Sequence, residues 1–248
     1  MQRLILLSAL VFLFIAGNPS FHVTLAAAQD AAVVNAKIVT VIFENDKVSV
    51  LRARYAPHQR LDMHSHPAKA EVQITDGRFR IFTPDAKSQD ASGKAGEFFR
   101  FPPTPQHAVE NPDDHPMELL EIEMKQATAP SASVSCSPSE SAHNSDPVPV
   151  EREVYHRCVF QNQYVRVFDV KLAPGEATGF HTHSHDNIPV FVEDATIQQE
   201  TFGEAEWKPA SKVSAGEAWY VKGNPPYTHR TKNAGNTPFR VIDVELLQ

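Results

Sequence analysis

The pattern of hydrophobic and polar positions after residue 29 is that of short β-strands. Segments rich in β-branched and aromatic residues lie at 33–41, 48–55, 71–82, 98–101 and 118–124, and 48–55 alternates in part. Asp76-Gly77 is a strong hairpin signal inside the third segment. No stretch of 12 or more residues has a convincing helical period, and 19 prolines argue against long helices. The pattern therefore predicts an all-β protein.

The same pattern occurs twice. Residues 41–45 (Val-Ile-Phe-Glu-Asn) align with 158–162 (Cys-Val-Phe-Gln-Asn), an offset of 117 (158 − 41). This indicates an internal duplication. The offset of 117 takes His64 to His181 and His66 to His183, and an offset of 122 takes His107 to His229, Asn111 to Asn233 and Ile122-Glu123 to Val244-Glu245.

Composition divides the chain into two domains. Residues 126–150 are crowded with Ser, Pro and Ala and hold almost no large apolar side chain, which is typical of a linker. We therefore expect one domain at 33–125 and a second at 151–248. Each is long enough for its own core.

The first 28 residues have the layout of a secretory signal peptide. Arg3 precedes an apolar run over 4–16, and Ala26-Ala27-Ala28 offers a small-residue cleavage site. We expect cleavage after Ala28 and a secreted or periplasmic protein; the alternative is an uncleaved anchor, although the run is shorter than a comfortable span of about 20 residues. The two cysteines, Cys136 and Cys158, would then be free to form a disulfide or to remain thiols.

Four side chains in the first copy form a candidate metal site. His64 and His66 are two apart, so on a strand both imidazoles face the same side, and Pro67 ends that strand. Glu71 can return on the next strand, and His107 supplies a fourth group. Imidazoles with one carboxylate suit a borderline divalent metal.

These residues resemble the two motifs of the cupin superfamily, G-x5-H-x-H-x3,4-E-x6-G and G-x5-P-x-G-x2-H-x3-N. The second motif is matched by Gly96, Pro102, His107 and Asn111, with Thr104 in a glycine place; in the first, His58 stands in a glycine place and Gly77 comes one residue early. The resemblance implies a jelly-roll-like antiparallel β-barrel in each copy, hence a bicupin. It also implies a divalent Mn, Fe, Ni or Zn ion held by His64, His66, Glu71 and His107.

The second copy departs from this pattern. His181, His183 and His229 remain, but an offset of 117 places Ile188 where the first copy has Glu71. His185 and Asp186 lie close by as replacement ligands. The sequence leaves open whether this second site binds metal.

Charge and the remaining polar residues narrow the function. The chain carries a formal charge of −7, or −8 without Arg3, and has no Lys/Arg cluster, which argues against nucleic acid as a partner. Asn111 and Asn233 are expected to cap turns. Phe99, Phe101, Phe180 and Trp219 are expected in the barrel core rather than stacked on a ligand. Gln73 and Arg80 are candidates to face the first barrel. Solvated loop positions are expected for His58, His115, His143 and His156.

The resemblance implies a small-molecule substrate and a monomer or homo-oligomer. The leading hypothesis is an exported metal-dependent enzyme of dioxygenase, decarboxylase or isomerase type. A dioxygenase would be an oxidoreductase, and a decarboxylase would be a lyase. The alternative is a barrel that binds a small molecule without converting it, or a storage-like cupin. No general acid or base is assigned by the sequence.

Overall fold

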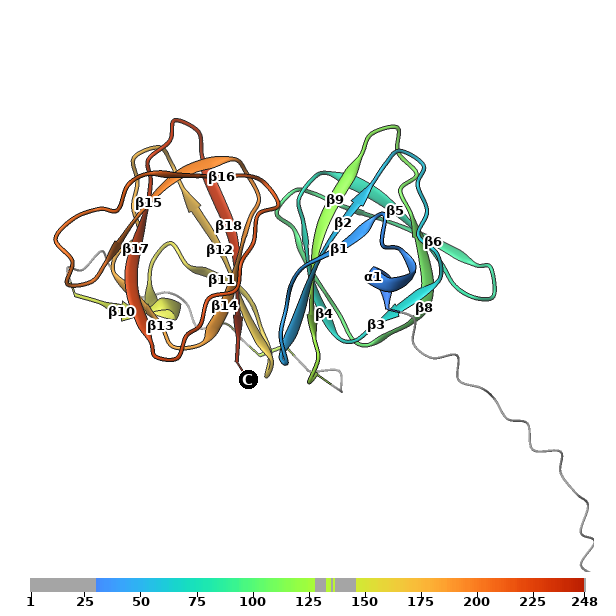
Figure 1. The fold of residues 1–248 in the computed structure, drawn as a ribbon, viewed down its shortest axis with the longest axis horizontal. Coiled ribbons are helices and arrows are strands. Elements are labelled where there is room, and N and C mark those ends of the chain that lie inside the picture. The colour runs from blue at the N-terminus through green and yellow to red at the C-terminus, as the bar shows by residue number, and fades with distance from the viewer. Residues whose placement is uncertain (1–29, 128–132, 135, 137–145, 248) are drawn as a thin grey trace, which may run out of the picture.

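The computed structural model describes residues 30–127, 133, 134, 136 and 146–247, which form two β-barrels side by side (Figure 1). The first contains α1 (Ala31–Val34), β1 (Val39–Glu44), β2 (Val48–Tyr55), β3 (His64–His66), β4 (Lys69–Gln73), β5 (Gly77–Phe82), β6 (Ser88–Gly93), β7 (Phe98–Phe101), β8 (Thr104–Glu110) and β9 (Met117–Met124). The second contains β10 (Val148–Pro149), the 3-10 turn η1 (Val150–Arg152), β11 (Arg157–Gln161), β12 (Val165–Leu172), β13 (His181–His183), β14 (Asp186–Phe191), β15 (Ala195–Thr201), β16 (Ser211–Val213), β17 (Tyr227–Asn233) and β18 (Phe239–Leu246). The all-β prediction is confirmed.

Each barrel is built from two sheets. The first barrel has the strand orders β1-β2-β9-β4-β7 and β3-β8-β5-β6, and the second has β11-β12-β18-β14 and β10-β13-β17-β15-β16. Corresponding strands occupy corresponding places, so the duplication read from the sequence is also a duplication of structure. Among the described residues, no helix has the length and hydrophobicity needed to cross a bilayer.

The two barrels share one hydrophobic core. In Figure 1 the sheet with β2, β9 and β4 lies against the sheet with β12, β18 and β14. Side chains from both sheets form a single buried cluster, which includes Val72, Ile122, Ile188 and Val244, each at most 1% exposed. Burial of this shared surface stabilises both barrels, because apolar area is removed from water on each side.

Two arginines bind across this interface in a related way. Arg240 donates to the carbonyl oxygens of Ala95 and Gly96, each at 2.9 Å, and Arg52 donates to the Gly216 carbonyl. Gly96 and Gly216 occupy equivalent turns with φ of 77° and 78°. Arg240 also pairs with Asp169 (Nε–Oδ1 2.9 Å), so this carboxylate holds an interface side chain in place.

Replacing Asp169 by asparagine is expected to lower the free energy of unfolding by about 2–3 kcal/mol at pH 7. This loss is smaller than the one expected when a fully buried ion pair is broken, because the arginine partners of Asp169 are partly exposed. The charges of Arg240 and Arg157 outweigh burial and hold the pKa of Asp169 below its usual range. Such a carboxyl stabilises the fold above its unfolded pKa of about 4 and loses that contribution as the pH falls through its folded pKa. Urea unfolding at pH 7 and pH 3 should therefore show that the parent is more stable than the Asp169→Asn variant at pH 7, and that this difference in stability shrinks at pH 3. An equal difference at both pH values would contradict the prediction.

Two predictions of local structure are wrong. Asp76-Gly77 does not form a hairpin, because β4 pairs with β7 and β9 whereas β5 pairs with β6 and β8 in the other sheet. Gly77 is needed for close packing, since a Cβ there would lie 2.5 Å from Met117 Sδ. The expected strand at 33–41 begins only at Val39, after the short helix α1.

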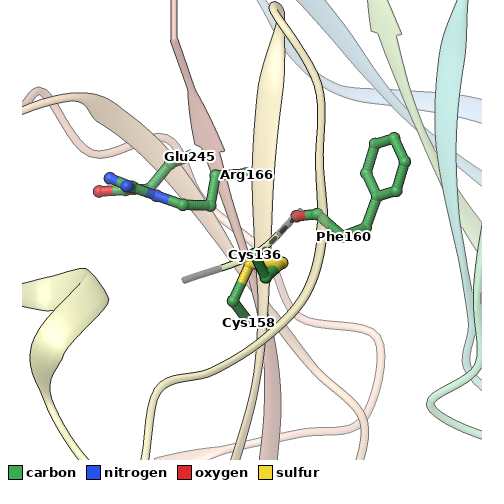
Figure 2. Close-up of a disulfide and its surroundings, with 5 residues drawn as sticks. All are labelled: Cys136, Cys158, Phe160, Arg166 and Glu245. Atoms are coloured by element: carbon green, nitrogen blue, oxygen red, sulfur yellow. Dashed lines mark hydrogen bonds and ion pairs between the residues drawn. A yellow bond between two sulfur atoms is a disulfide. The ribbon is translucent and has the colours of Figure 1, made fainter. Parts of the chain in front are cut away.

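A disulfide joins Cys136 to Cys158 on β11, with their Cα atoms 5.8 Å apart (Figure 2). It answers the question that the sequence left open. The bond attaches part of the expected linker to the second barrel. The expected signal peptide, His143 and most of 128–145 lie outside the described residues.

Candidate metal centres

Three imidazoles of the first barrel converge on one point. His64 and His66 lie at the two ends of β3, and His64 is directly opposite His107 of β8. The three side chains place ligand atoms within 4.8 Å of one another, and their residues are 1%, 5% and 8% exposed. The structure thus brings together the three histidines predicted for this site.

The hydrogen bonds around these rings leave the inner nitrogens free. Each Nδ1 has an outer partner: the Asp62 carbonyl for His64 (2.7 Å), the Pro105 carbonyl for His107 (2.9 Å) and Glu123 Oε1 for His66 (2.6 Å). His66 Nε2 is buried and has no hydrogen-bond partner. Outer partners of this kind fix the tautomer and orientation of metal-ligating histidines, so the donor set fits a divalent metal.

Glu71 lies in the same cavity but is engaged elsewhere. Lys69 is two residues earlier on β4 and points to the same interior face, with Nζ 3.3 Å from Glu71 Oε2. Lys69 also bonds Glu121, which is opposite Glu71 in the register of β4 and β9. His66, Glu121 and Glu123 form a second group with ligand atoms within 4.8 Å. The fourth ligand was predicted to be Glu71. Glu121 is a second carboxylate beside it that could serve as that ligand.

Burial sets the charge of this interior. Desolvation lowers the pKa of His66 and of His107 to about 4, so both rings are neutral and can donate lone pairs at neutral pH. Burial raises the pKa of Glu123 to about 8. Burial opposes the charges of Lys69 and Glu121, but their mutual attraction wins, raising the pKa of Lys69 and lowering that of Glu121 to about 2.

The imidazoles open onto a cavity of about 270 Å³ inside the first barrel. Phe79, Phe99 and Phe101 line it together with Lys69 and Glu121. Gln73 is fully buried, but Arg80 lies 39% exposed and pairs with Asp90 (2.9 Å), so it is a surface arginine. The cavity can therefore hold a small, partly apolar molecule next to the imidazoles.

The second barrel repeats the histidine arrangement. His181 is directly opposite His229 in the pairing of β13 with β17, and their ring centroids are 4.6 Å apart. His181 Nδ1 donates to the Gly179 carbonyl (3.0 Å), and His229 Nε2 is buried without a hydrogen-bond partner. His183 Nδ1 lies 3.6 Å from Glu245, which Arg166 holds in place (Figure 2).

The sheet register corrects the sequence alignment at the fourth ligand. Glu71 lies opposite Glu121, and the residue opposite the equivalent Asp243 is Pro189. Ile188 therefore corresponds to Ala70, and it points into the core between the barrels. The second copy has one extra residue after its H-x-H pair, and one residue reverses the face of a strand.

Of the two expected replacement ligands, Asp186 is engaged outside the second site, and His185 belongs to none of the converging ligand groups found among the described residues. Asp186 pairs with Lys47 of the first barrel (2.6 Å) and accepts a hydrogen bond from Gly223 N (2.9 Å). In contrast, His156, expected in a solvated loop, is 5% exposed and its ring centroid lies 4.3 Å from that of His181. His156 comes immediately before β11, whose first residue, Arg157, is exposed, so His156 lies on the opposite, interior side, and the sequence pattern alone did not reveal this.

Two of the expected loop histidines and both turn-capping asparagines occupy their expected places, whereas the four aromatic residues expected in the barrel core do not: Phe99, Phe101 and Phe180 are only partly buried and Trp219 is 37% exposed. His58 and His115 have exposed side chains. Asn111 Nδ2 donates to the carbonyls of Ala56 and His115, and Asn233 Nδ2 donates to those of Leu172 and Thr237. Trp219 lines the second cavity, of about 330 Å³, and packs on Phe191, whereas Phe180 packs on Phe202.

The family model of the cupin domain matches residues 51–123, which contain all four residues of the first predicted site. The chain contains a cupin domain. Its two barrels make it a bicupin in architecture, and the side chains of both barrels include groups able to hold a divalent metal.

Several solved structures have a fold similar to that of this bicupin over most of its length. AerE from Microcystis aeruginosa is 15% identical over 85% of this chain and 98% of that one, with a TM-score of 0.53. Bacillus subtilis oxalate decarboxylase, described with Mn(II) centres, is 13% identical over 84% and 71%, with a TM-score of 0.52. Lactobacillus farciminis oxalate decarboxylase, as a formate complex, is 11% identical over 81% and 77%, with a TM-score of 0.51. These identities show a shared fold alone, and a comparison with curated proteins gives no match.

Proposed function

We propose that this bicupin is an exported metalloenzyme whose first barrel acts on a small organic molecule, as a lyase or an oxidoreductase. The observation that supports it is the convergence of His64, His66 and His107 with their outer nitrogens all hydrogen-bonded. A divalent metal bound there would act as a Lewis acid toward an oxygen of the bound molecule. Similarity in fold to oxalate decarboxylases makes small carboxylic acids the first compounds to test.

The carboxylates of the cavity divide the remaining roles. Glu71 and Glu121 lie opposite each other and both line the cavity. One of them completes the ligand set, and the other, paired with Lys69, exchanges a proton with the bound molecule. The aromatic wall of Phe79, Phe99 and Phe101 orients an apolar part of that molecule and keeps water away from it.

Replacing His107 by alanine is expected to remove one equivalent of metal and to abolish turnover, because one of the three converging imidazoles is lost. Elemental analysis of the purified mature chain, residues 29–248, measures the metal. Release of CO2 from small dicarboxylic and keto acids and uptake of O2 with catechols measure activity. Mass spectrometry of the exported chain checks the cleavage site.

His115→Ala is the matched control, since this histidine is exposed and outside the cavity. Unchanged metal content in both His107→Ala and His64→Ala would contradict the proposal. Stoichiometric binding of a compound without product would instead favour the second candidate, a barrel that captures a small molecule. The cavity of about 270 Å³ is compatible with that role too.

A further inference from the structure

His156 stands where the first barrel has an apolar residue. Arg157 pairs with Asp169 as Thr40 pairs with Arg52, so the two registers make His156 the counterpart of Val39. Val39 is 2% exposed and belongs to the core of the first barrel. The second barrel thus has a histidine at a position that packing alone would fill with a hydrophobic side chain.

This histidine lies beside the ligand histidines of its barrel. His156, His181 and His183 place ligand atoms within 4.8 Å of one another. His229 is not part of this group of three, but it lies beside it on β17, with its ring centroid 4.6 Å from that of His181 and 5.3 Å from that of His183. The four histidines come from three separate parts of the chain, because His181 and His183 form one H-x-H pair.

One carboxylate orients two of these rings. Glu153 Oε2 accepts from His156 Nδ1 at 2.7 Å, which leaves the His156 Nε2 lone pair for a ligand. Glu153 Oε1 accepts from Gly179 N at 3.0 Å, and the Gly179 carbonyl in turn accepts from His181 Nδ1. Glu153 is 2% exposed, so a carboxyl group is buried where it fixes the ring positions.

The second barrel has no carboxylate at the position that corresponds to Glu71 of the first barrel. Pro189 replaces it, and the nearest interior carboxylate on β18, Asp243, is engaged by Asn187 Nδ2 (2.8 Å). Glu245 faces the outer nitrogen of His183 and is held by Arg166. The carboxylates that surround the imidazoles are therefore outer partners, and a nitrogen is the available fourth donor.

We propose that the second barrel binds a divalent metal through four imidazoles, with His156 in place of the carboxylate of the first barrel. An all-nitrogen set favours Co²⁺, Ni²⁺, Cu²⁺ or Zn²⁺ over Mn²⁺, which prefers oxygen donors. The charge of the ion is balanced by Glu153 and Glu245 from the outer shell. This site is independent of the activity proposed for the first barrel.

The test uses the full mature chain with the first site disabled by His107→Ala. Calorimetric titration with Co²⁺ and with Mn²⁺ measures binding at the second site. We expect one equivalent of Co²⁺ to bind, and Mn²⁺ to bind at least tenfold more weakly. Adding Glu153→Gln should weaken Co²⁺ binding about 10–100-fold, and adding His156→Val should weaken it further, because a ligand itself is lost.

Valine is chosen because Val39 packs well at the equivalent position, and circular dichroism checks that the variant folds. His115→Ala in the same background is the control and should bind Co²⁺ like its parent. Absence of a Co²⁺ equivalent in the parent, or parent-like affinity in both the His156→Val and Glu153→Gln variants, would overturn the proposal. Either result would leave the function proposed for the first barrel unaffected.

Discussion

Replacing Ile188 by glutamate is expected to prevent folding at neutral pH, although an alignment of the two copies suggests that it would restore a metal ligand. Ile188 is fully buried in the core between the barrels. An ionised carboxylate without a cation there should cost on the order of 5 kcal/mol or more, comparable to the whole stability of many domains. We expect insoluble protein, or a urea midpoint too low to measure.

Pro189→Glu is the matched control, because Pro189 lines the cavity of the second barrel and lies opposite Asp243. This carboxylate would reach the interior that holds the histidines and can take up a proton beside Asp243, so we expect a folded protein that loses about 3 kcal/mol of stability. The two variants differ by one position in the chain and should differ widely in urea midpoint. A stable Ile188→Glu variant would contradict the register of β14 against β18.

The sequence predicted most of the fold and three of the four histidines gathered in the second barrel, and the reason is physical. Repeated spacing locates the histidine pairs, because the H-x-H pair reads directly as one face of a strand. It cannot locate a residue beyond an insertion, since a single extra residue turns every later side chain to the opposite face. The matching of Glu71 to Ile188 failed for this reason, and Pro189 is the true counterpart.

Residues outside the motifs were harder to recognise. Lys69 and Glu121 belong to the first cavity through the pairing of β4 with β9, which only the assembled sheet defines. The recurrence of Glu123 as Glu245 was visible in the repeat, but its role beside a ligand histidine was not. The Asp76-Gly77 signal failed because a local turn preference does not say which sheet the next strand joins.

Replacing Lys69 by methionine is expected to lower the stability of the metal-free protein and raise its metal affinity at the same time. Lys69 is buried between Glu71 and Glu121, and its removal leaves two facing carboxylates without a cation. Breaking a buried pair in this way costs about 3–5 kcal/mol at pH 7. A divalent ion can take over the neutralising role, so we expect Mn²⁺ or Zn²⁺ to bind at least tenfold tighter, about 1.4 kcal/mol or more.

The opposite signs make this prediction specific. A lysine that only packs against the barrel wall would, on removal, lower stability with and without metal and leave affinity unchanged. Urea unfolding with chelator and with added metal measures both terms, since a tighter-binding ion shifts the midpoint further. Lys94→Met is the control, because Lys94 is an exposed partner of Asp76 and its loss should leave the urea midpoint nearly unchanged. Weaker metal binding in Lys69→Met would mean that the ammonium group organises the site, and that Glu71 needs its partner in order to bind the ion.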